Sequence, residues 1–170
     1  NTAAIHTSLN SGVRLFSEAL ADSGYALAHS GKWHVCADER PDDRGWTSYL
    51  ATSVGGQDYN GLTWEQWRER AQRPEPDTPR SPGEVLRPGW GRLRLYGTDE
   101  DAARGDELIV RRGIEALTDL VAGGRPWCLY IGPNGPHDPY IIPSRYANMY
   151  DPDDVELPAN WGDDLEDKPR

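Results

Sequence analysis

Two stretches of sequence, YALAHSGKWH at residues 25–34 and WCLYIGPNGPH at residues 127–137, decide the fold. Each begins with a short, mostly apolar run of the kind that forms a buried strand, and each then passes into a polar segment containing Gly or Pro. A helical pattern precedes both runs. The order of helix, buried strand and polar loop, occurring twice, predicts an α/β fold with a central, mostly parallel sheet flanked by helices.

Apolar spacing predicts the two helices. The first ends at a Ser-Gly pair, residues 23–24, and its apolar face is expected to comprise Val13, Phe16, Ala19 and Leu20. The second is expected to start after Thr98 as N-cap and to end at a Gly-Gly pair, residues 123–124. Its predicted apolar face comprises Val110, Ile114, Leu117 and Val121. The strand at 127–131 is expected to be buried on both faces.

The region between the two units is rich in Gly, Pro, Trp and charged residues. A helix is predicted over 63–72, and residues 73–91 hold five prolines, which favours an extended path. We therefore expect one domain over residues 1–170, interrupted by a loop-rich excursion at about 55–97.

Charge and hydropathy exclude two classes of partner. The 170 residues carry a formal net charge of -10, whereas a nucleic-acid-binding protein needs a basic face. No window approaches the roughly 20 apolar residues of a membrane span. An acidic chain still accommodates an anionic substrate when a few cations are concentrated in a cleft. Cys36 and Cys128 are expected to be small buried side chains rather than a disulfide or ligands.

Three side chains suited to binding an anion follow the two predicted strands. Lys32 and His34 are two residues apart, so an extended backbone points both to one face, with Trp33 opposite. His137 lies between Pro136 and a following Asp-Pro, which restricts its backbone. Because ligands of parallel sheets bind at the carboxyl ends of the strands, we expect these groups to surround one tetrahedral anion.

At these residues the sequence resembles the sulfatase family of the alkaline-phosphatase-like superfamily. Gly24-Tyr25 followed by residues 31–34 is similar to the family's GY…GKWH segment, and Arg44-Gly45-Trp46 to the RGF or RGW that follows it. Residues 126–130 with 136–140 are similar to PFFLY…PHxPY, and residues 149–158 are also typical. The signatures occur in the family's order over most of the chain.

The resemblance implies a sulfuric ester hydrolase that acts on a small-molecule or carbohydrate sulfate ester with a formylglycine and a bound Ca²⁺. Lys32 is similar to the lysine that contacts the sulfate and the formylglycine. His34 resembles the histidine that deprotonates the hydrated aldehyde, and His137 resembles the histidine that binds sulfate and assists the leaving oxygen.

The departures from the family pattern concern the nucleophile and the metal. Neither cysteine lies in a C/S-x-P-x-R motif, and no Asp-Asp pair follows a first strand. We therefore expect an internal fragment of the N-terminal catalytic domain, inactive alone, without metal ligands. The acidic pairs, which we interpret as solvated turns, are at 42–43, 153–154 and 163–164. Two alternatives stay open: a phosphonate monoester or phosphodiester hydrolase of the same superfamily, and a non-catalytic anion-binding module.

Overall fold

The structure, a computed structural model, describes residues 8–36, 38–52, 69, 72, 74–87, 91–164 and 166. The helices are α1 (Phe16–Asp22), α3 (Arg104–Ala122) and α4 (Ser144–Ala147), with 3-10 turns η1 (Pro41–Arg44) and η2 (Pro152–Asp154). The strands are β1 (Ala26–Lys32), β2 (Thr47–Thr52), β3 (Glu84–Arg87), β4 (Gly91–Arg94), β5 (Tyr96–Thr98), β6 (Trp127–Gly132) and β7 (Tyr140–Ile142). Apart from residues 69 and 72, the helix predicted over 63–72 lies outside the described residues.

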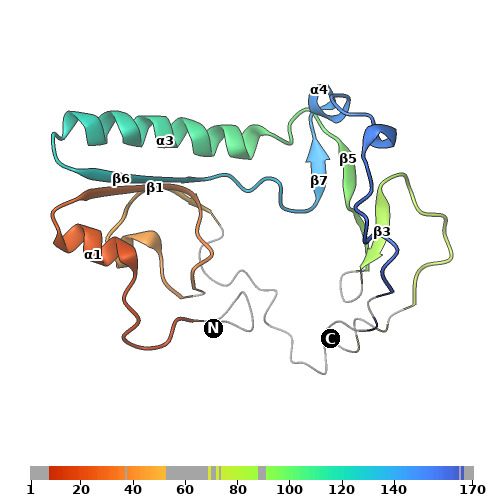
Figure 1. The fold of residues 1–170 in the computed structure, drawn as a ribbon, viewed down its shortest axis with the longest axis horizontal. Helices are drawn as coiled ribbons and strands as arrows, with labels where there is room; N and C mark the ends of the chain where they lie inside the picture. Colours follow the sequence, from red (N-terminus) through yellow and green to blue (C-terminus); the bar gives the residue numbers. More distant parts are fainter. Residues whose placement is uncertain are drawn as a thin grey trace.

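The core is a parallel three-stranded sheet of order β2-β1-β6, with α3 on one face and α1 on the other (Figure 1). On the α1 side, Leu27 of β1 is buried against Trp33 and Trp46. On the α3 side, Ala28 is buried against Ala116 and Leu120. The described residues therefore form the mixed α/β structure with a parallel sheet flanked by helices that the sequence predicts.

Strand β1 lies at the centre of this sheet and is its most buried element. The predicted strand at 25–30 is confirmed and continues to Lys32, with five consecutive buried residues at 27–31. Gly24 ends the preceding turn with φ +84°, and its N–H donates to the Ala21 carbonyl at 3.0 Å, as the Ser-Gly stop predicts. The predicted apolar face of α1 is confirmed only in part: Leu20 packs against the core, whereas Val13 and Phe16 are 39% and 65% exposed. Ser17, which is not part of the predicted face, is buried.

Strand β6 is an edge strand, so the expectation that it is buried on both faces is wrong. Trp127, Tyr130 and Ile131 are 42%, 45% and 38% exposed. An apolar run is equally compatible with a central strand and with an edge strand, because the difference depends on which neighbours pair with it.

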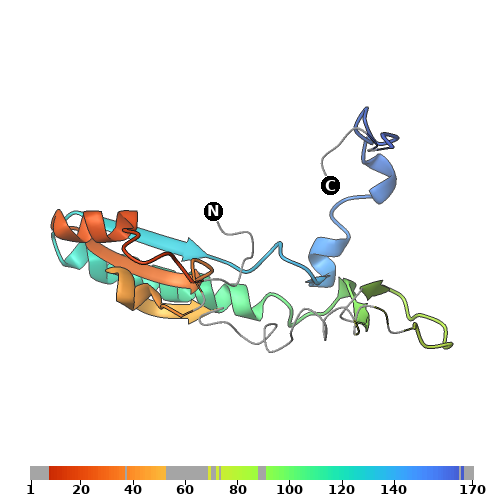
Figure 2. The same ribbon diagram turned by 90° about the horizontal axis from the view of Figure 1, so that it is seen from below.

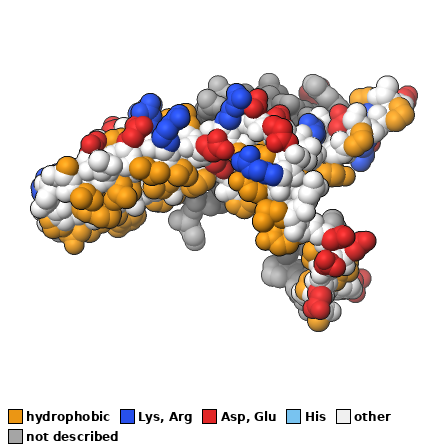
Figure 3. Space-filling model, turned by 90° about the horizontal axis from the view of Figure 1, so that it is seen from above, with side chains coloured by type: hydrophobic (Ala, Val, Ile, Leu, Met, Phe, Trp, Pro, Cys, Tyr) orange, Lys and Arg blue, Asp and Glu red, His pale blue; other side chains and the backbone are white. Residues whose placement is uncertain are grey.

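Helix α3 begins at Arg104, six residues after the predicted N-cap Thr98. Its buried stripe is Ile109, Gly113, Ala116 and Leu120. Two residues of the predicted face, Ile114 and Val121, are instead 58% and 62% exposed. In the left-hand part of Figure 3, hydrophobic side chains gather along the lower edge and charged side chains lie above them.

The excursion contains regular structure that the sequence did not predict. Strands β3 and β4 pair antiparallel, and β5 pairs parallel with β7. From β7 the chain enters α4, and residues 151–164 extend away from the sheet (Figure 2). No helix in the described part of the chain is long and apolar enough to cross a membrane.

Candidate functional site

The site is built where β1, β2 and β6 end. Parallel pairing aligns Gly31 with Gly132 and Lys32 with Thr52, so all three carboxyl ends lie at the same edge of the sheet. Gly31 is required at this contact. With φ +122°, an added Cβ would lie 2.1 Å from the Gly132 carbonyl oxygen. The segment that leaves β1 and the loop that leaves β6 therefore start side by side.

The segment after β1 is anchored by Trp33 between the two polar side chains. Trp33 is 4% exposed; its backbone N–H donates to the Thr52 carbonyl at 2.8 Å and its indole N–H to the Glu39 carbonyl at 2.9 Å. Lys32 is half-buried and His34 is exposed. This difference in burial agrees with the predicted arrangement, in which Trp33 faces the core and its neighbours face the opposite side.

The loop after β6 carries His137. The His137 backbone N–H donates to the Asn134 carbonyl at 3.1 Å, and its side chain is 56% exposed. Ring atom Nδ1 lies 2.6 Å from the Asp138 carbonyl oxygen. Because a carbonyl only accepts hydrogen bonds, this contact is a hydrogen bond when Nδ1 carries a proton, and it does not involve Nε2.

Arg87 of β3 is a cation that the sequence analysis missed. Its Nη1 lies 2.5 Å from Asp138 Oδ2, and Asp138 Oδ1 lies 3.2 Å from His137 Nδ1. The Asp138 carboxylate therefore connects the guanidinium to the imidazole. No signal in the sequence pointed to Arg87, because it lies in the excursion, outside the segments that resemble sulfatase signatures, and is 50 residues from His137.

The Arg-Gly-Trp segment at 44–46 has a structural role. Arg44 donates to both carboxylate oxygens of Glu39 at 2.6 Å and to Glu18 at 3.2 Å. The Arg44 hydrogen bond holds the pKa of the Glu39 carboxyl below its ordinary value. Gly45 has φ +86°, and Trp46 is buried in the core. The segment thus closes the turn that leads into β2.

His29 lies in the middle of β1, three residues before Lys32, and is 1% exposed. Its ring stacks on Tyr130 at 5.0 Å between centroids and makes edge contacts with Trp33 and Trp46. Neither ring nitrogen has a hydrogen-bond partner among the described residues. Desolvation lowers the pKa of His29. Nearby backbone atoms of Leu50 and Lys32 partly oppose this lowering, although neither forms a hydrogen bond of normal geometry with the ring. His29 is therefore a packed, neutral core residue.

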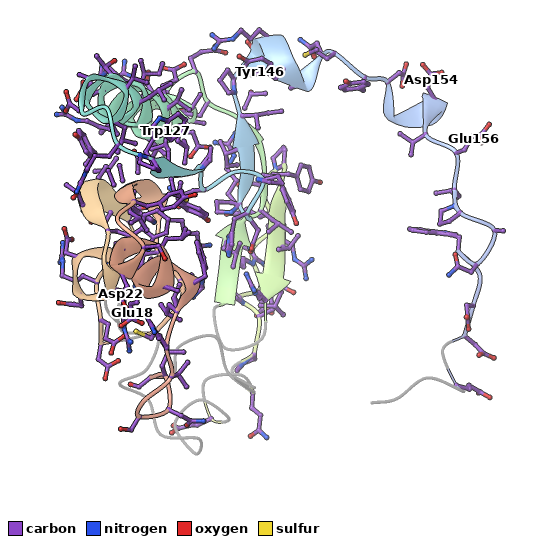
Figure 4. The ribbon with its side chains drawn as sticks, turned by 60° about the vertical axis from the view of Figure 1, so that its left-hand side comes forward. Glu18, Asp22, Trp127, Tyr146, Asp154 and Glu156 are labelled. Carbon is purple, nitrogen blue, oxygen red and sulfur yellow. The ribbon has the colours of Figure 1, made fainter. Side chains whose placement is uncertain are left out.

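The acidic side chains of the described residues do not converge. No group of three or more His, Cys, Asp or Glu lies close enough to hold a metal ion there. In Figure 4, Glu18 and Asp22 lie far from Asp154 and Glu156. Asp42 instead accepts the Ser48 N–H at 3.1 Å, as a turn residue does. The described residues therefore do not fit a calcium site. Cys36 and Cys128 are free thiols, and Cys36 is buried as predicted, whereas Cys128 is only half-buried because it lies on the edge strand β6.

A scan against models of protein families found no match, and a search of curated proteins found no similar sequence.

Proposed function

We propose that this chain supplies the sulfate-binding and acid/base residues of a sulfuric ester hydrolase with an alkaline-phosphatase-like fold. The observation that carries the proposal is the parallel register of β1 and β6, which starts the Lys32–His34 segment and the His137 loop side by side. The resemblance of both segments to sulfatase signatures supports the same function.

The three side chains have distinct roles in this proposal. The Lys32 ammonium stabilises the negative charge on the sulfate oxygens, a contribution that is usually large in such reactions. Protonated His137 donates its Nε2 proton to the ester oxygen as the sulfur–oxygen bond breaks. The His34 imidazole accepts a proton during release of sulfate. None of the three is the nucleophile, which the resemblance assigns to a formylglycine outside these residues.

The test is sulfate ester hydrolysis by the active enzyme that contains these residues. We expect Lys32→Ala and His137→Ala each to lower turnover of an aryl sulfate by about 10²- to 10⁴-fold. Arg125→Ala is the matched control, because Arg125 is an exposed cation that precedes β6 at the opposite end of the sheet. It should leave turnover unchanged. Full activity in both Lys32→Ala and His137→Ala would refute the proposal.

Assays of the same enzyme with different esters distinguish a sulfatase from a phosphonate monoester or phosphodiester hydrolase. Sulfate and phosphate groups are both tetrahedral oxyanions, so a phosphonate monoester or phosphodiester hydrolase would use similar residues. Measuring kcat/KM for an aryl sulfate, an aryl phosphonate and a phosphodiester decides between them. We expect the aryl sulfate to be preferred, and a preference for either phosphorus ester would replace the proposal with the alternative.

A further inference from the structure

The loop that carries His137 is held by a carboxylate from the first turn of α3. Asp106 Oδ1 accepts the Asn134 N–H at 2.7 Å, and Asp106 Oδ2 accepts the Gly135 N–H at 3.0 Å. One side chain thus binds two consecutive backbone amides in a bidentate arrangement. Hydrogen bonds to an ionised acceptor are roughly twice as strong as neutral ones. Asp106 is therefore the main anchor of residues 134–135 on α3.

Gly135 lies close to the same carboxylate. A Cβ at Gly135 would lie 2.9 Å from Asp106 Oδ2, closer than real Cβ atoms approach other heavy atoms. Because Oδ2 is the end of a flexible side chain, an alanine here would require only a small shift of the carboxylate. Glycine therefore permits the close approach of Asp106 to the loop.

Asn134 connects this anchor to both halves of the candidate site. Its carbonyl accepts the His137 N–H at 3.1 Å, and its side-chain Oδ1 accepts the Thr52 hydroxyl at 3.4 Å. The Thr52 carbonyl in turn accepts the Trp33 N–H at 2.8 Å. A continuous path of hydrogen bonds thus runs from Asp106 through Asn134 and Thr52 to the residue between Lys32 and His34.

We propose that Asp106 is a positioning residue of the oxyanion site, which fixes His137 relative to Lys32 and His34. The inference rests on the function proposed above. Without the carboxylate, the two amides at 134–135 lose their acceptor and the loop samples other conformations, whereas Lys32 on β1 stays in place. Binding of the sulfate group is then largely kept, but proton donation by His137 is impaired. The loss should appear in kcat more than in KM.

The test uses sulfate esters whose leaving groups differ in basicity. Asp106→Asn keeps the size of the side chain but replaces one acceptor oxygen with an NH₂ group. We expect kcat to fall about 10- to 100-fold for an alkyl sulfate, as is usual when an orienting residue is lost. For 4-nitrophenyl sulfate the fall should be smaller, because a weakly basic leaving group needs little proton donation. A general loss of folding would lower both rates equally.

The control is Glu107→Gln, which removes the same charge one residue along α3. The Glu107 carboxylate is 64% exposed and lies 3.7 Å from Arg145, with no bond to the loop in the described structure, so kcat should stay near that of the wild type. Thr52→Val is a second variant, since it keeps the side-chain shape and removes only the hydroxyl bond to Asn134. We expect it to share the leaving-group dependence in weaker form.

Backbone amide exchange, measured by NMR on the chain itself, provides a readout that needs no turnover. In Asp106→Asn the Asn134 and Gly135 amides should exchange faster and the His137 ring signals should shift. Unchanged exchange, or equal loss of kcat for all leaving groups, would overturn the positioning role and leave the sulfatase proposal standing. A wild-type enzyme that hydrolyses no sulfate ester would instead overturn the proposed function and this inference together.

Discussion

Replacing Gly31 by Ala tests most sharply how closely β1 and β6 approach at the site. The added Cβ would lie 2.1 Å from the Gly132 carbonyl oxygen, 2.7 Å from its carbonyl carbon and 2.9 Å from Ile109 Cγ2. Two of these atoms belong to the backbone of the neighbouring strand, so no side-chain rotation relieves the contact. The strand ends must therefore separate.

The magnitude follows from two contributions. A non-glycine residue at positive φ costs roughly 1–2 kcal/mol, and forcing extra volume into a packed interior costs about 1–3 kcal/mol more. We therefore expect Gly31→Ala to lower the free energy of unfolding by about 4 kcal/mol, the sum near the upper end of these ranges. That is a large fraction of the roughly 5–15 kcal/mol stability of a typical domain.

Gly24→Ala is the matched control. Gly24 also has positive φ, +84°, but an added Cβ there meets no atom within 4 Å. Its cost should be the backbone contribution alone, about 1 kcal/mol. Urea unfolding followed by tryptophan fluorescence measures both variants. Equal losses of stability for Gly31→Ala and Gly24→Ala would refute the close approach of β1 and β6.

Three further predictions concern burial and charge. Ile109→Ala should lower the free energy of unfolding in urea by about 2–5 kcal/mol, because the Ile109 side chain is 0% exposed. Ile114→Ala should lower it by less than about 1 kcal/mol, because Ile114 is 58% exposed. Because the pKa of His29 is lowered in the folded state, the unfolded state takes up the proton first as the pH falls. The free energy of unfolding should therefore be full above the ordinary pKa of 6.5 and should decrease as the pH drops from 6.5 toward the folded-state pKa. Urea unfolding curves at pH 7.5 and 5.5 should show this decrease in the wild type and not in His29→Phe. Arg44→Lys should lower the thermal midpoint, because lysine does not bind both Glu39 oxygens in parallel; an unchanged midpoint would contradict this.

The sequence predicted β1 well because an apolar run and a preceding turn both indicate a buried strand there. Residues 26–32 combine an apolar run with a preceding Gly turn, and the central strand of a sheet is buried on both faces whatever its neighbours are. The parallel arrangement was also predictable, since each strand follows a helix and runs into a polar loop. The apolar run, the Gly turn and the order of the elements can be read from the sequence, whereas the central position of β1 follows from its pairing with β2 and β6.

The face of α3 was not predictable by the same reasoning. Its buried stripe contains Gly113 and Ala116, whose small side chains let the helix approach the sheet. A Cβ at Gly113 would lie 2.5 Å from Ile131 Cδ1. Hydrophobic periodicity gives weight to large side chains, so it selected the stripe containing Ile114 and Val121, which is exposed in the structure.

The candidate site was predictable only as far as the strand ends. Their order along the chain assigned Lys32, His34 and His137 to loops at the carboxyl ends of parallel strands, although Lys32 proves to be the last residue of β1. Arg87 and Asp106 reach the His137 loop from distant elements, β3 and α3, and such tertiary contacts leave no local pattern in the sequence.

The proposed function requires the Lys32–His34 segment and the His137 loop to hold one oxyanion between them. The most direct measurement is a crystal structure of the chain soaked with tungstate, whose anomalous signal locates a tetrahedral oxyanion without ambiguity. We predict tungstate within hydrogen-bond distance of the Lys32 ammonium and the His137 ring. Tungstate bound away from these two side chains, or no bound tungstate at all, would contradict the account.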